Sequence, residues 1–160
     1  MELYNKLSAK QRAVLIEKAG GKRLTLSFYK YHNIKNPKLF RDHLYIAWNK
    51  IDVLGRIYIA QEGINGQLSL PSENFKKFKK SIDEIKFLKD LRLNIAIEHD
   101  NLSFLKLKIK LRDKIVADGL DSLDIDLTKC GKHLDAEEFN VLIEKPETLV
   151  IDMRNHYESE

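Results

Sequence analysis

GRIYIAQEGINGQLSLP, residues 55–71, is the stretch that decides how this chain folds. Two apolar runs, residues 57–60 and 67–70, flank a six-residue loop that contains the dipeptide Asn65-Gly66. Asn-Gly is a strong signal for a tight hairpin turn, because both residues adopt positive φ at low cost. Apolar side chains alternate along each arm, so the sequence predicts a β-hairpin with one buried face.

The segments on either side of the hairpin complete a βαββαβ order. Residues 24–31 alternate as a strand, and Asn36-Pro37 begins a helix with apolar residues at four-residue spacing. After the hairpin, residues 71–85 form a second helix with an apolar inner face, and residues 92–98 form a strand. This order predicts an α+β, ferredoxin-like domain over residues 23–114, with an antiparallel sheet and two helices on one face.

An additional strand follows, over residues 104–112. Leucine and isoleucine alternate strictly there with Lys106, Lys108, Lys110 and Arg112, so one strand face is wholly basic. Side chains on one strand face recur at about 6.6 Å, close to the phosphate spacing along a nucleic-acid strand. Two interpretations stay open on this pattern alone: contact with phosphates, or an edge strand that lysines protect against aggregation.

Two tyrosines raise a related possibility. Tyr29 and Tyr31 lie on the polar side of the first strand, where RNA-recognition motifs of this architecture stack bases. Residues 67–70, however, carry no aromatic side chain at the third strand, where that module needs one. We therefore expect the two tyrosines to cover a neighbouring strand or helix.

Charge divides the chain into two parts. Residues 1–114 contain 24 Lys and Arg against 12 Asp and Glu, whereas residues 115–160 contain 4 against 12. Such asymmetry indicates separate units. Two interpretations of the basic unit stay open on composition alone: a lysine-rich solvated surface, or a surface that binds a polyanion. We expect an N-terminal helix within residues 1–22 and a linker over residues 115–131. A helix and a strand within residues 132–160 cannot close a core, so they indicate an incomplete second domain.

Composition excludes several classes of protein. No apolar run approaches the roughly 20 residues of a membrane helix, and the N-terminus lacks the apolar core of a signal peptide. The single cysteine, Cys130, cannot form an internal disulfide, which favours the reducing cytoplasm. The five histidines show no metal-ligand spacing, and no P-loop or GxGxxG motif occurs, so no cofactor or metal is identifiable.

Several motifs, in one order, resemble a single family. They are SFYKY at 27–31, GRIYIAQEGINGQLSLP at 55–71, LRLNIA at 91–96, KLRDKIVADG at 110–119 and VIDMRNHYESE at 150–160. From residue 24 onward the chain resembles the rhodanese-domain tRNA uridine hydroxylases. The resemblance implies that uridine at wobble position 34 of tRNA becomes 5-hydroxyuridine, with dioxygen as co-substrate. It also implies that the ferredoxin-like domain precedes a rhodanese-like domain with a cysteine in its active-site loop.

The resemblance carries over to residues of this chain only in part. Residues 132–160 resemble the opening of the rhodanese-like domain, with Asp152 and Arg154 in the D-x-R of its first strand. The family's cysteine would lie beyond Glu160 and Cys130 does not match it, so we assign no catalytic residue and expect the chain alone to be inactive. The expected partners are the anticodon arm of tRNA and the rest of the rhodanese domain, with no membrane contact. We assign RNA contacts to Arg56, Lys106, Lys108, Lys110, Arg112 and Lys114, and one wall of the active site to Glu62, Asn65, Asp113, Asp152 and Arg154.

Three other functions are considered. A rhodanese-type sulfurtransferase acting on tRNA or on a protein differs from the hydroxylase only in its product. A non-catalytic module that docks a protein on the open sheet face would have no affinity for RNA. An acylphosphatase-like hydrolase is excluded, because it needs a glycine-rich loop with an arginine after the first strand, and residues 32–36 contain neither.

Overall fold

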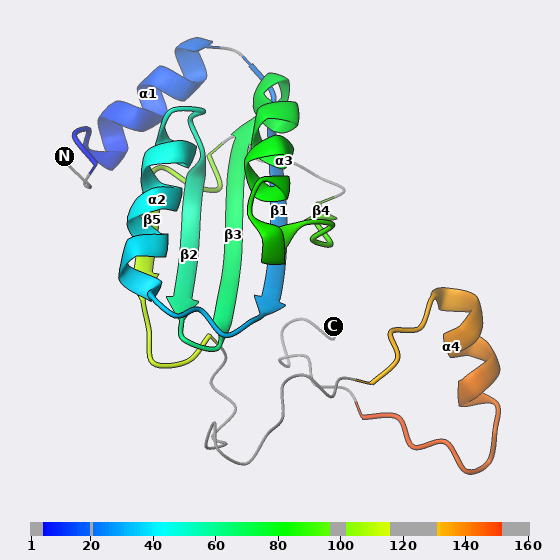
Figure 1. Cartoon of the computed structure of the whole chain (residues 1–160). Helices are drawn as coiled ribbons and strands as arrows, with labels where there is room; N and C mark the ends of the chain where they lie inside the picture. The colour runs from blue at the N-terminus through cyan, green and yellow to red at the C-terminus, as the bar shows by residue number, and fades with distance from the viewer. Residues whose placement is uncertain (1–4, 20, 97–101, 116–130, 152–160) are drawn as a thin grey trace. The chain divides into compact units, whose positions relative to one another are not determined.

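The structure, a computed structural model, describes residues 5–19, 21–96, 102–115 and 131–151. The chain divides into two compact units, Met1–Ile125 and Asp126–Glu160. The first unit contains the sheet and most of the helices, and the second contains one helix in its described part (Figure 1). Each unit is described by itself.

The first unit is a mixed α/β structure built on a five-stranded sheet. Its sheet order is β4-β1-β3-β2-β5, and α2 and α3 lie on the same face of the sheet (Figure 1). All neighbouring strands are antiparallel except β2 and β5, which are parallel, so the extra strand makes the sheet mixed. None of the helices in the described ranges is both long and apolar enough to cross a membrane. The elements are α1 (Ala9–Ala19), β1 (Arg23–Tyr31), α2 (Pro37–Asn49), β2 (Leu54–Ala60), β3 (Gly63–Pro71), η1 (Ser72–Asn74), α3 (Phe75–Asp83), η2 (Lys86–Leu88), β4 (Asn94–Ile95) and β5 (Leu107–Leu111).

The central hairpin turns at Gln61-Glu62, because Ala60 already pairs with Gly63. The predicted six-residue loop is therefore wrong, and Asn65-Gly66 lies inside β3. Gly66 has a packing role there: a Cβ at this position would lie 2.7 Å from the Cζ atom of Phe28. The glycine makes room for a buried ring, which the turn chemistry of Asn-Gly does not predict.

The core lies between the sheet and its two covering helices. Four hairpin side chains that the alternation predicted to face inward have no exposed surface: Ile57, Ile59, Leu68 and Leu70. On the helices, Trp48 of α2 and Phe78 of α3 are fully buried, with ring centroids 5.3 Å apart. The indole Nε1 of Trp48 donates to the Ser81 hydroxyl at 3.1 Å, which joins the two helices. Each such apolar side chain contributes about 1.5–3 kcal/mol on burial.

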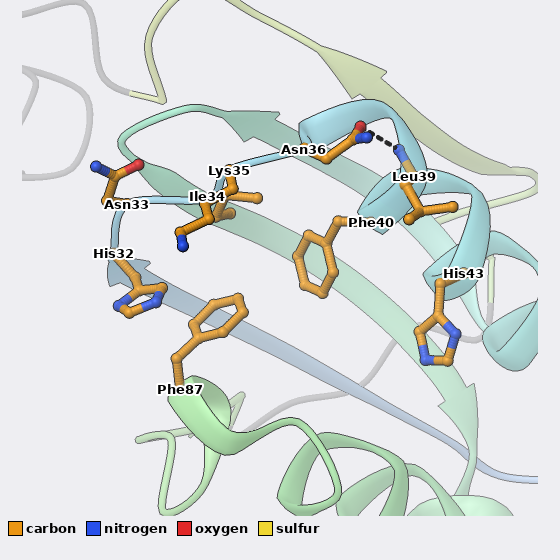
Figure 2. Close-up of a pocket in the computed structure, with 9 residues that line it drawn as sticks. All are labelled: His32, Asn33, Ile34, Lys35, Asn36, Leu39, Phe40, His43 and Phe87. Carbon is orange, nitrogen blue, oxygen red and sulfur yellow. Dashed lines mark hydrogen bonds between the residues drawn. The ribbon is translucent and has the colours of Figure 1, made fainter.

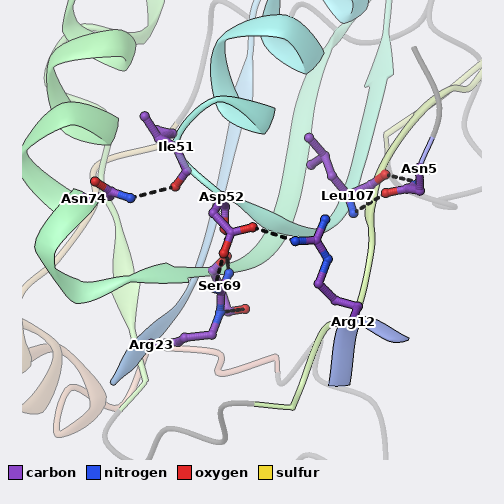
Figure 3. A network of polar contacts seen from close by, with 8 residues as sticks. All are labelled: Asn5, Arg12, Arg23, Ile51, Asp52, Ser69, Asn74 and Leu107. Atoms are coloured by element: carbon purple, nitrogen blue, oxygen red, sulfur yellow. Dashed lines mark hydrogen bonds and ion pairs between the residues drawn. The ribbon is translucent and has the colours of Figure 1, made fainter. Parts of the chain in front are cut away.

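A polar network fixes α1 to the end of the sheet where β1 and β2 begin (Figure 3). The guanidinium of Arg23 is 4% exposed and donates to the Asp52 carboxylate at 2.9 Å and to the Asp52 backbone carbonyl at 2.6 Å. Arg12 of α1 donates to the same carboxylate at 3.1 Å. Burial lowers the pKa of Arg23, and the hydrogen bond that its guanidinium donates to Asp52 offsets this only in part. The buried cation is thus paired, as a stable interior charge must be.

Both edge strands are shorter than the sequence predicts. The strand expected over residues 92–98 is reduced to β4, in which Ile95 is 47% exposed; residues 97–98 lie outside the described part. The basic strand expected over residues 104–112 is reduced to β5, where Leu107 and Ile109 are buried and Leu111 is 40% exposed. Each edge strand has a neighbour on one side only, so its ends lack the partners that extend a ladder.

In the second unit, α4 (Ala136–Ile143) is the helix expected within residues 132–160, and it begins with a capping box. The Asp135 carboxylate accepts from the Glu138 backbone N–H at 2.9 Å, and the Glu138 carboxylate accepts from the Asp135 N–H at 3.2 Å. Residues 149–151 do not form the strand expected within residues 132–160 and are largely exposed, and residues 152–160 lie outside the described part. Most of the predicted linker, residues 116–130, lies outside it as well.

Candidate nucleic-acid interface

The sheet face turned away from α2 and α3 carries a row of cations over β2 and β5. Ile57 and Ile109 point into the core, so their neighbours in sequence point to the opposite face. In the parallel register Arg56 lies beside Lys108, and Tyr58 beside Lys110. Arg56, Lys108, Lys110 and Arg112 are all exposed, and Lys106 is half-buried. We call these five residues the cationic strip: Arg56, Lys106, Lys108, Lys110 and Arg112.

The electrostatics of this face favour an anion. Like charges on neighbouring strand positions destabilise a sheet, and two unit charges about 5 Å apart repel by about 1 kcal/mol even in water. The strand residues that share this face in the described part of the sheet include no Asp or Glu. A polyanion bound to this face would neutralise the repulsion between Arg56 and Lys108. It would meet no carboxylate from the described strand residues of the face.

β5 is an edge strand, as the edge-protection interpretation of its lysines requires. At Leu107, however, the edge is covered by another group: Asn5 donates to the Leu107 carbonyl at 2.9 Å and accepts from its N–H at 3.2 Å (Figure 3). Strand side chains stand roughly perpendicular to their sheet. Lys108 and Lys110 therefore project from the sheet face and not within the plane of the sheet, from which an additional strand would approach the edge.

The ends of the strip differ from its centre. The Arg112 N–H donates to the Ile59 carbonyl at 2.9 Å, and its guanidinium carbon lies 5.2 Å from the centroid of the Tyr58 ring, in cation–π range. The carbonyl of Lys106 accepts from the Gly55 N–H at 3.0 Å. Lys114 lies beyond β5 and is half-buried. The structure thus places Arg56, Lys108, Lys110 and Arg112 together and exposed. Lys106 is less exposed at one end of the strip, and Lys114 lies beyond its other end.

Two of the residues assigned to an active-site wall hold the backbone that leaves β5. The Ile115 N–H donates to the Glu62 carboxylate at 2.7 Å, and the Asn65 amide donates to the Ile115 carbonyl at 3.4 Å. Asp113 is exposed just before this clamp. Asp152 and Arg154, like Cys130, lie outside the described residues. The structure therefore brings Glu62, Asn65 and the start of the following segment together.

Tyr58 is the residue of this face that the sequence reasoning missed. It is half-buried, lies between Asn65 of β3 and Lys110 of β5, and supports Arg112. The signal was present, because Tyr58 alternates with the buried Ile57 and Ile59 and so shares a face with Arg56. Tyr29 is 54% exposed, which does not fit the covering role that the sequence predicts for it.

A separate open pocket of about 580 Å³ lies beside the loop between β1 and α2 (Figure 2). His32 stacks on Phe87 there, with ring centroids 4.4 Å apart. The backbone N–H groups of His32 and Ile34 donate to the carbonyls of Glu62 and Gln61, at 2.8 and 2.7 Å, so they hold the hairpin turn instead of facing a phosphate. Within the described ranges, no group of three or more His, Cys, Asp or Glu side chains could hold a metal ion.

Comparison of the sequence with known proteins shows the family of this chain. Residues 23–115 match the UPF0176 acylphosphatase like domain. The chain is 49% identical to a tRNA uridine(34) hydroxylase of Leptospira interrogans, 47% identical to one of Photorhabdus laumondii and 43% identical to one of Escherichia coli. Each match covers 99% of this chain but only 42–45% of the relative, so the chain spans less than half the length of these curated relatives. The matched domain covers more than half of the chain, and the chain belongs to the UPF0176 family.

Proposed function

We propose that this chain is the tRNA-facing part of an enzyme that forms 5-hydroxyuridine at wobble position 34 of tRNA. Relatives 43–49% identical over nearly the whole chain carry the name tRNA uridine(34) hydroxylase. One observation carries the RNA contact: cations lie side by side in register on an exposed sheet face whose described strand residues include no carboxylate.

The cationic strip binds the phosphates of the anticodon arm. Phosphate contacts set register and affinity, while the target uridine is read as an unstacked loop base. Arg56, Lys108, Lys110 and Arg112 form the exposed centre of this contact, and Lys106 and Lys114 extend it at either end. The fixed spacing of the strands gives these contacts a geometry that a mobile lysine-rich tail lacks.

The chemistry lies in the part of the relatives that this chain does not span. There a rhodanese-like domain supplies the active-site cysteine, and dioxygen is the co-substrate in the cytoplasm. Residues 132–160 open that domain, and the rest of it is the second partner of this chain. Glu62 and Asn65 hold the backbone of Ile115, where the chain leaves β5, and with Asp113, Asp152 and Arg154 they form one wall of the site.

Binding of a tRNA anticodon stem–loop, followed by fluorescence anisotropy over a salt series, tests the strip. Lys108→Glu combined with Lys110→Glu should weaken binding and lower the slope of log affinity against log salt, because each lost phosphate contact removes about 0.7–0.9 from the slope. The matched control is Lys76→Glu with Lys80→Glu, which changes the net charge equally on exposed positions of α3.

The control should lose less affinity and keep the slope. Equal losses of affinity in both double variants would mean that the strip contributes only through the net charge of the protein. An unchanged salt slope in the Lys108 and Lys110 variant would overturn the assignment. The reaction itself is tested by nucleoside mass spectrometry of tRNA from cells that lack the gene. Loss of 5-hydroxyuridine supports the hydroxylase, whereas loss of a sulfur-containing uridine identifies a sulfurtransferase.

A further inference from the structure

Tyrosines lie in line with the cationic strip on the same sheet face. The register places Tyr29, Asn65, Tyr58 and Lys110 side by side across β1, β3, β2 and β5. Neighbouring strands are about 4.8 Å apart, so the backbones of Tyr29 and Tyr58 lie about 10 Å apart and those of Tyr58 and Lys110 about 5 Å apart. Aromatic rings and cations thus form one row.

Each tyrosine is held on one side and leaves ring surface accessible. Tyr29 meets Tyr31 in an edge-to-face contact, with centroids 6.4 Å apart and planes at 74°, yet it remains 54% exposed. The Tyr58 ring lies 5.2 Å from the Arg112 guanidinium and is half-buried. These contacts reduce the rotamer freedom of both rings before any ligand binds, which lowers the entropy cost of stacking.

From this row we infer that Tyr29 and Tyr58 stack unpaired bases, so that the sheet face binds a single-stranded RNA loop and not a duplex. The inference rests on the proposed function and adds which form of RNA this face takes. In a duplex the bases stack on one another and only phosphates, sugars and base edges reach a flat protein surface. Unpaired bases have accessible faces, and aromatic stacking of such bases is tolerant of sequence. The strip then holds the phosphates while the tyrosines hold the bases.

The test compares two RNAs with an equal number of phosphates: an anticodon stem–loop and a blunt duplex. Tyr29→Ala should weaken stem–loop binding about tenfold, leave duplex binding unchanged and keep the salt slope, because no phosphate contact is lost. Tyr29→Phe, which retains the ring, should bind the stem–loop like the wild type. Phe139→Ala, which removes an exposed ring from the second unit, is the control for loss of an aromatic side chain.

A second readout observes stacking itself. With 2-aminopurine in the loop, binding to the wild type should quench the fluorescence, and Tyr58→Ala or Tyr29→Ala should relieve the quenching at saturating protein. Circular dichroism verifies that each variant is folded. Equal weakening of both RNAs by Tyr29→Ala, or quenching unaffected by either substitution, would overturn the inference.

The outcomes separate this inference from the proposed function. A wild-type chain that binds neither RNA contradicts both. If the Lys108 and Lys110 variant loses affinity while the tyrosine variants do not, the phosphate contact stands and base stacking is wrong. A wild-type chain that prefers the duplex would also overturn the stacking inference, since the tyrosines would then have no unpaired base to meet.

Discussion

Glu62 and Asn65 bind the two polar groups of one backbone residue. The Glu62 carboxylate accepts the Ile115 N–H at 2.7 Å, and the Asn65 amide donates to the Ile115 carbonyl at 3.4 Å. Ile115 is itself only 5% exposed and lies against Gly63, where a Cβ would come within 3.1 Å of its Cδ1 atom. The clamp therefore fixes where the chain leaves the sheet after β5.

We expect Glu62→Ala to lower the free energy of unfolding by about 1–3 kcal/mol, because it removes the acceptor of a largely buried N–H. Glu62→Gln retains an acceptor and should cost less. Gln61→Ala, at the exposed neighbouring turn position, is the matched control and should stay within about 0.5 kcal/mol of the wild type. Urea unfolding measures all three. A Glu62→Ala variant as stable as the control would show that the clamp does not hold Ile115.

At the scale of residues, the sequence predicted which side chains face the core but not what the polar ones contact. Alternation placed Ile57 and Ile59 inward and Arg56 outward, as observed. The turn predicted at Asn65-Gly66 is wrong. Gly66 instead provides space for Phe28, which is far away in sequence. The partners of Glu62 and Asn65 lie about fifty residues away, so no local pattern could indicate them.

Among the elements, β3 has a packing that requires a glycine, Gly66. It is the central strand, paired with β1 along its whole length and with β2 from Gly63 to Ser69. At Gly66, an added Cβ would lie 2.7 Å from Cζ and 3.0 Å from Cε1 of the buried Phe28 ring. That ring also meets Trp48 edge to face, with centroids 6.1 Å apart, so it has little room to move.

Gly66→Ala should therefore destabilise the chain by about 1–3 kcal/mol, the usual cost of overpacking a core. Gly21→Ala is the control, because an added Cβ there meets nothing within 4 Å; it should be neutral or slightly stabilising. Thermal unfolding followed by circular dichroism compares the two substitutions. If Gly66→Ala proves as stable as Gly21→Ala, the close packing of Phe28 against β3 is not a constraint on this strand.

Element type and order follow from the sequence more securely than element length. The hairpin, the capping residue Asn36 and the apolar spacing of α2 were all indicated locally, and Asn36 does accept from the Leu39 N–H at 3.0 Å. The shortening of β4 and β5 depends on their position at the sheet edges, which is a property of the topology. The parallel pairing of β5 with β2, which creates the cationic strip, likewise joins residues that are about fifty positions apart in the sequence.

For the whole molecule, the buried core and the cationic strip both belong to the first unit. Every residue of the main apolar cluster lies between Leu24 and Ile109. In the second unit, α4 and the residues after it expose much of their apolar surface, as with Val141 at 62% and Leu149 at 82%. Residues 126–160 contain 4 Lys and Arg against 9 Asp and Glu, so they are acidic where the first unit is basic.

Removing residues 126–160 should therefore leave the stability of the first unit unchanged and strengthen RNA binding at low salt. The core contributes most of the free energy of folding, and it stays intact in a chain of residues 1–125.

Loss of the acidic segment raises the positive potential around the strip. The gain in RNA affinity should fade as salt screens it, since the Debye length falls from about 30 Å at 0.01 M to about 10 Å at 0.1 M. Urea unfolding and anticodon stem–loop binding at both salt concentrations measure the two effects. A lower unfolding midpoint would mean that the second unit contributes to the stability of the first, and an affinity gain that persists at high salt would mean that the acidic segment blocks the interface by direct contact.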